Sequence, residues 1–246
     1  MDLNNIKKVK VPYVLNIDYK KLFGKSWYKV LKKSQKFMSS TYLYNLMIFL
    51  NEVYKNDYEE IVFPKKENLF ENFRLTEFSR IKVVIIPNGV YPHALVGGCG
   101  INSLTEFGLP FFSHYWNTSI ENALGTLNLN FSPTMNSYMK QGVFLLPSFQ
   151  TLSRKERFKH KNIWKNFTEF ILSVLNKKAY LCFLFLGEDI ANEFKHCIDT
   201  EKHDVFIVDD LIKEVGYKKG AKVWSASVLD EINQKLSEHN KNEITW

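Results

Sequence analysis

The sequence predicts an α/β fold, a central four-stranded parallel sheet flanked by helices on both faces. Two observations predict it. Four short apolar runs are typical of buried strands: Val83 to Ile86, Val143 to Leu146, Tyr180 to Leu186 and Val205 to Val208. Helix-length segments separate these runs, which favours parallel strands covered on both faces. Helical patterns are expected at Tyr42 to Tyr54, Ser119 to Leu127, Ile163 to Leu175 and Ser227 to Ser237.

Length and composition predict one domain with a full core. The chain has 246 residues, 45% of them hydrophobic, with 20 Phe and 12 Tyr. Residues 26–246 are assigned to this domain, and residues 1–25 to a basic N-terminal arm or extension. No apolar run approaches the roughly 20 residues that span a bilayer, and the N-terminus has no hydrophobic signal core. We therefore expect no membrane association and an intracellular location, in the cytoplasm or in a host nucleoid or nucleus.

The three cysteines are Cys99, Cys182 and Cys197, and none stands in a C-x-x-C spacing. Free thiols in a reducing compartment are expected, with no metal site and no cofactor.

The charge pattern is compatible with nucleic-acid binding. The net charge is +7 and the pI is near 9.1. Basic residues concentrate in 151–180 and again at Lys218, Lys219 and Lys222. Such clusters are either a solvated surface or a phosphate-facing patch.

In an open parallel sheet, ligands bind outside the carboxyl ends of the strands. The loops that begin at Pro87, Pro147, Gly187 and Asp209 are therefore the candidate site.

Several framework segments carry a family resemblance. From Val62 the chain reads V-F-P-K-K-E-N-L-F-E-N-F-R-L-T-E-F-S-R-I-K-V-V-I-I, and later segments are K-Q-G-V-F-L-L, N-I-W-K-N-F-T-E-F-I and a terminal I-T-W. In order and spacing they resemble the family 1 uracil-DNA glycosylases. The resemblance implies that fold and a site for a nucleotide flipped out of DNA.

The catalytic positions implied by the resemblance hold other residues. The water-orienting aspartate position falls on Gly89, with Asn88 at the preceding glutamine. The base-reading asparagine position is Pro147, and the leaving-base histidine falls near Val208. Glycine and proline offer no side chain for these tasks.

Other positions are predicted to contact a flipped base or the DNA backbone. The predicted base pocket consists of Asn88, Tyr91, Phe111 and Phe112. Predicted DNA contacts are Lys159, His160, Lys161, Leu211, Ile212, Lys218, Lys219 and Lys222, with Leu211 or Ile212 as the wedge in the vacated stack. At the phosphate-gripping Gly-Ser position the chain has Gly187-Glu188, followed by Asp189, and these carboxylates would repel a phosphate.

The leading hypothesis is a catalytically silent homologue that acts as a DNA-binding or scaffold module in replication, repair or transcription. Its partner would be DNA, with or without uracil or modified bases, or a replication or transcription protein. One alternative is an active DNA glycosylase for a modified pyrimidine, in which Asn88 positions the water. A second is a protein-interaction domain without nucleic-acid binding, favoured by Glu188 and Asp189. The Asn-, Lys-, Ile- and Tyr-rich composition suggests a viral or phage source.

Overall fold

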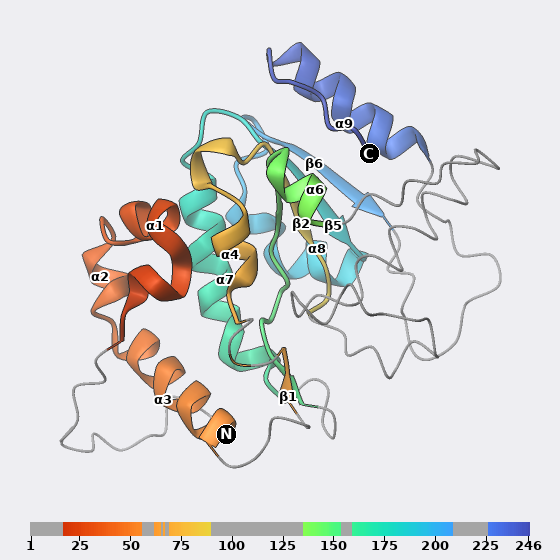
Figure 1. The fold of residues 1–246 in the computed structure, drawn as a ribbon. Helices are drawn as coiled ribbons and strands as arrows, with labels where there is room; N and C mark the ends of the chain where they lie inside the picture. Colours follow the sequence, from red (N-terminus) through yellow and green to blue (C-terminus); the bar gives the residue numbers. More distant parts are fainter. Residues whose placement is uncertain are drawn as a thin grey trace.

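The computed structural model describes residues 17–55, 62–64, 66, 69–89, 135–153, 159–208 and 226–246. Their centre is a four-stranded parallel sheet with strand order β3-β2-β5-β6 (Figure 1). The strands are β2 (Val83–Ile86), β3 (Val143–Leu145), β5 (Cys182–Leu186) and β6 (Asp204–Val208). The predicted fold class is confirmed, and each strand lies within or next to its predicted apolar run.

Side chains from each strand alternate between two hydrophobic cores, one on each face of the sheet. On β2, Val84 and Ile86 join the larger core, whereas Val83 and Ile85 join the smaller one. This alternation follows from the period of two in a β-strand. Because both of their faces are covered, β2, β3 and β5 are apolar throughout, which made them visible in the sequence. The edge strand β6 begins with Asp204 and is only half-buried.

Helices cover both faces, as predicted. The larger core is covered by α1 (Tyr19–Leu31), α3 (Thr41–Lys55), α4 (Glu71–Leu75), α7 (Lys161–Leu175) and α8 (Glu188–Phe194). The smaller core is covered by α6 (Met135–Lys140) and α9 (Ala226–Glu238). The remaining short elements are α2 (Gln35–Met38), η4 (Phe78–Arg80), η6 (Lys195–Cys197) and an antiparallel pair of β1 (Val62–Phe63) with β4 (Leu152–Ser153). The helix predicted at Ser119 to Leu127 lies outside the described residues.

Helix α1 belongs to the domain. Its Phe23 ring lies 4.7 Å from that of Phe70 and 5.4 Å from that of Phe73, centroid to centroid. The indole of Trp27 donates a hydrogen bond to the carbonyl of Thr76 at 3.0 Å. The boundary expected at residue 25 therefore falls inside an element that packs into the core, and residues 1–16 lie outside the described part.

None of the helices in the described ranges is both long and apolar enough to cross a membrane.

Candidate functional site

The carboxyl ends of β2 and β3 are joined by backbone hydrogen bonds that continue past the strands. The N–H of Leu146 donates to the carbonyl of Ile85 at 2.8 Å, and the N–H of Ser148 donates to that of Pro87 at 3.0 Å. These two bonds hold the loop after β2 against the loop after β3, which is where the sequence places the site.

A buried amide pair fixes the loop after β3. Asn72 on α4 donates to the carbonyl of Leu145 at 2.7 Å and to the side-chain oxygen of Gln150 at 3.4 Å. The Gln150 amide nitrogen in turn donates to the carbonyl of Pro147 at 2.8 Å. Both ends of the Gln150 amide are thus engaged in holding the loop. Gln150 cannot replace the base-reading asparagine expected at Pro147 without breaking these bonds.

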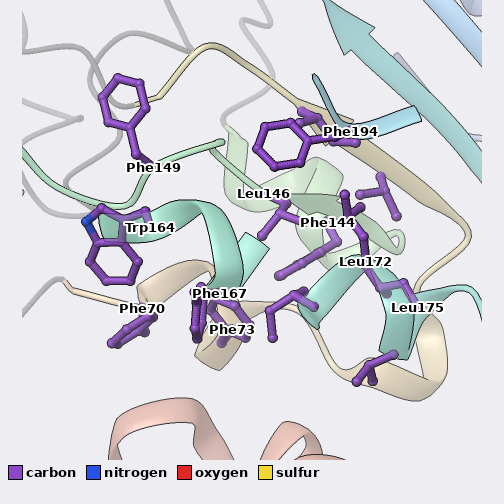
Figure 2. Packing of buried hydrophobic residues seen from close by; sticks show 14 of the residues in the cluster. Phe70, Phe73, Phe144, Leu146, Phe149, Trp164, Phe167, Leu172, Leu175 and Phe194 are labelled. Atoms are coloured by element: carbon purple, nitrogen blue, oxygen red, sulfur yellow. The ribbon is translucent and has the colours of Figure 1, made fainter. Parts of the chain in front are cut away.

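Gly89 is covered by an aromatic ring. Its backbone has φ +82°, a conformation that favours glycine. A Cβ at this position would lie 2.0 Å from Cζ of Phe149 and less than 2.5 Å from two further ring carbons. Phe149, four residues beyond β3, is completely buried (Figure 2). The volume that a side chain at position 89 would need is filled by this ring, so a carboxylate fits there only if the Phe149 ring moves.

Two buried polar atoms accompany this ring. Oδ1 of Asn88 and Oγ of Ser148 are buried, and neither has a hydrogen-bond partner among the described residues. A buried unsatisfied polar atom costs about 1–3 kcal/mol. In native proteins it usually indicates an ordered water or a ligand group. The strand ends therefore keep buried polar atoms that could bind a water or a ligand, although position 89, where the resemblance places the aspartate, is a glycine covered by the Phe149 ring.

The carboxyl end of β5 is followed by acidic residues, and β6 ends in an aliphatic residue. Gly187 donates its N–H to the carbonyl of Val208 at 2.7 Å, with φ +106°. Glu188 and Asp189 form the first turn of α8, where negative charge interacts favourably with the helix dipole. Val208, at the position expected for the histidine, is half-buried and aliphatic. The histidine before it, His203, lies at the amino end of β6, where its Nδ1 accepts the N–H of Leu181 at 3.2 Å.

The predicted DNA contacts around α7 fall into different environments. His160, predicted as a DNA contact, is buried and only 4% exposed. Its ring nitrogen Nδ1 lies 3.0 Å from Oγ1 of Thr151, and its ring meets that of Phe49 edge-on. Lys161 forms an ion pair with Glu193 at 2.7 Å, which offsets its charge. Lys159 is exposed.

The remaining predicted site residues lie outside the described part of the chain: Tyr91, Phe111, Phe112, Leu211, Ile212, Lys218, Lys219 and Lys222. Within that part, no group of three or more His, Cys, Asp or Glu side chains is placed to hold a metal ion.

Sequence reasoning did not single out Phe149. The available signal was a bulky aromatic shortly after Pro147 combined with a glycine at the carboxylate position.

The chain is similar to known proteins in both sequence and fold. No protein-family model matches the sequence. The uracil-DNA glycosylase of Buchnera aphidicola subsp. Acyrthosiphon pisum is 31% identical over 190 residues, which cover 72% of this chain and 79% of the relative. The uracil-DNA glycosylase of Blochmanniella floridana is 29% identical over 217 residues, covering 83% and 91%.

Among solved structures, mimivirus uracil-DNA glycosylase superposes with a TM-score of 0.70 at 20% identity, covering 93% of this chain and 88% of that one. A variant of the mimivirus protein in complex with UGI superposes with a TM-score of 0.69, covering 93% and 90%. The parallel sheet with its site loops at the carboxyl edge is thus a uracil-DNA glycosylase fold. Together with the sequence relatives, this shows that the chain belongs to the uracil-DNA glycosylase family.

Proposed function

We propose that this protein is a member of the family that does not excise uracil, and that it acts as a DNA-binding or scaffold module. The observation that carries this proposal is the Phe149 ring over Gly89, which occupies the space of a side chain at the position of the catalytic aspartate. Base excision passes through a cationic sugar and an anionic leaving base, so a site without a carboxylate loses charge compensation at the reacting carbon.

Two further positions support the same proposal. Pro147 has neither an N–H nor a side-chain donor for a uracil edge. Its carbonyl is already used by Gln150. The aliphatic Val208 supplies no donor for a departing base. Each change removes a different task of the reaction, so restoring any one of them would leave the others unmet.

DNA as the partner rests on the charge of the whole chain and on the relatives' names. A net charge of +7 favours binding to a phosphate backbone, and such binding weakens steeply with salt. Glu188 and Asp189 disfavour a phosphate at the start of α8. We therefore expect a DNA pose that differs at this helix, with Lys159 among the contacts. A replication or transcription protein is the other proposed partner.

The test is a single-turnover incubation of excess protein with uracil-containing single-stranded DNA, followed by cleavage of abasic sites. Binding to the same DNA is measured at increasing salt. We expect no strand scission over many hours, and binding that persists near 150 mM salt, roughly the physiological ionic strength. Uracil-dependent scission that Asn88→Ala abolishes would overturn the silent-homologue proposal. Loss of all binding near physiological salt would favour the protein-interaction domain instead.

One observation favours a second candidate function, excision of a modified pyrimidine. The buried Oδ1 of Asn88 has no partner among the described residues, and an amide oxygen in this position can hold a water. A parallel incubation with DNA that carries modified pyrimidines separates the two functions. Scission there, lost in Asn88→Ala and retained in Ser148→Ala, would make Asn88 the water-positioning residue. Ser148 is the matched control because its Oγ is a neighbouring buried polar atom without a partner in the described part.

A further inference from the structure

A polar pocket lies at the opposite edge of the sheet from the candidate site. It has a volume of about 480 Å³ and is lined by three segments, 79–82, 140–141 and 241–243. The first leads into β2, the second leads into β3, and the third follows α9. Because parallel strands begin at the same edge, the chain brings these segments together at the amino ends of β2 and β3. We call it the amino-edge pocket.

The walls of the amino-edge pocket are fixed by specific contacts. Gly142 has φ +99°, and a Cβ on it would lie 2.2 Å from the carbonyl oxygen of Arg80, so only glycine permits this close approach. Gln141 and Thr245 bond reciprocally: the Thr245 N–H donates to Oε1 of Gln141 at 2.8 Å, and Nε2 of Gln141 donates to the Thr245 carbonyl at 3.2 Å. The pocket is therefore a built feature and not a gap between mobile side chains.

Positive charge dominates the lining. Four cations, Arg80, Lys82, Lys140 and Lys241, face one carboxylate, Glu243. Lys82 donates to the carbonyl of Glu243 at 3.2 Å, and a bond to a neutral carbonyl does not cancel its charge. Among the described residues no carboxylate forms an ion pair with Lys140 or Lys241, while Arg80 has only Glu77 at 3.9 Å.

The cations also act on one another. Burial lowers the pKa of Lys82, and the charge of Lys241 lowers it further. The same two causes lower the pKa of Lys178, whose ammonium donates to the carbonyl of Phe78 at 2.8 Å. Four like charges held together with a single carboxylate among them are a cost that a bound anion would relieve.

We propose that the amino-edge pocket binds phosphate groups, either of a free polyphosphate or of a nucleic-acid backbone. Lysine ammonium groups and an arginine fork are the donors that proteins use for phosphate oxygens. The lining segments contain no aromatic residue on which a base could stack, so the pocket is suited to phosphates and not to bases. Binding of a free polyphosphate would be independent of the proposed function, whereas binding of a nucleic-acid backbone would rest on it and add a contact at the other edge of the sheet.

The test compares two matched pairs of substitutions in the full chain. Lys140→Gln with Lys241→Gln removes two charges from the pocket, and Lys20→Gln with Lys21→Gln removes two from the exposed start of α1. Lys82 is left intact because it holds the pocket wall. Inorganic pyrophosphate and a single-stranded oligonucleotide are titrated into each protein by calorimetry at two salt concentrations. Thermal melting checks that both variants fold, and Lys140→Gln alone is the reserve variant.

We expect the pocket pair to weaken binding at least about tenfold, since each charge-assisted hydrogen bond contributes about that factor or more. The control pair should change binding by less than about threefold. Weakening for pyrophosphate supports a free polyphosphate, and weakening for the oligonucleotide alone, with a smaller salt dependence, supports a nucleic-acid backbone. Equal affinities of the pocket and control pairs for both probes would overturn the proposal, and so would binding of neither probe by the unmodified chain.

Discussion

Gly89 and Phe149 should be energetically coupled, and the structure sets the size of the effect. Gly89→Ala places a methyl group 2.0 Å from the Phe149 ring, at a backbone φ of +82°. The left-handed conformation costs an alanine about 1–2 kcal/mol. Overpacking a closed site adds about 1–3 kcal/mol. The single substitution should therefore lower the free energy of unfolding by about 2–5 kcal/mol.

Removing the ring separates these two contributions. Phe149→Ala alone should cost about 3–5 kcal/mol, as is usual for a buried phenylalanine. In that background Gly89→Ala should cost only the conformational part, about 1–2 kcal/mol. The coupling energy of the double-mutant cycle is then about 1–3 kcal/mol.

Urea unfolding followed by circular dichroism measures all four proteins of the cycle. Gly24→Ala is a second positive-φ substitution, with φ +75° and ψ 161°, whose added Cβ would meet Arg74 at an ordinary 3.4 Å and does not meet Phe149. It should show a backbone cost without overpacking by the Phe149 ring. Additivity of the two substitutions within about 0.5 kcal/mol would refute the claim that Phe149 fills the space of a side chain at position 89.

Three further outcomes are expected. Burial lowers the pKa of His203 from its ordinary 6.5, so the imidazole binds a proton more readily in the unfolded chain than in the folded one. The free energy of unfolding should therefore be highest above pH 6.5 and fall as the pH drops below 6.5. Urea titrations at several pH values should show this dependence, and His203→Gln should flatten it. Burial raises the pKa of the Cys182 thiol to about 11, so little reactive thiolate forms in the native protein. Peptide mapping after iodoacetamide treatment should find Cys182 unmodified in the native protein and modified after unfolding. Rapid labelling of the native protein would contradict its buried placement. Oγ1 of Thr151 accepts a hydrogen bond from the indole N–H of Trp164 at 2.7 Å. Thr151→Val leaves this buried donor without a partner and should lower the free energy of unfolding by about 1–3 kcal/mol. An unchanged urea midpoint would show that the bond contributes little to stability.

Strands β2, β3 and β5 could be predicted from the sequence because both of their faces are buried. Their short apolar runs were interpreted as strands, and the structure differs from the prediction only in where the strands begin and end. Leu146 was predicted in a strand but lies just beyond β3, although its N–H still donates to the carbonyl of Ile85. Helix α1 was harder to predict, because its place depends on Phe23 meeting Phe70 and Phe73 from a distant segment.

At the site, local sequence could place Gly89 and Pro147 at strand ends but could not show what fills the space beside them. The Phe149 ring reaches Gly89 only because the loops after β2 and β3 are bonded side by side. His160 illustrates the same limit. Its burial comes from Thr151 and Phe49, which belong to segments that a linear pattern around the histidine does not contain.

The separation of the interior into two cores places tryptophans of the described part of the chain on both sides of the sheet. Trp27 and Trp164 are fully buried in the larger core, whereas Trp246 packs against the smaller core and donates its indole N–H to the carbonyl of Leu229 at 3.2 Å. With Trp116 and Trp224 replaced by phenylalanine, replacing either Trp246 or the pair Trp27 and Trp164 in addition would let intrinsic fluorescence report on one side of the sheet at a time. If α9 detaches before the aromatic layer melts, the two emission signals will show different denaturation midpoints, and the domain will prove to be two cooperative units that share one sheet.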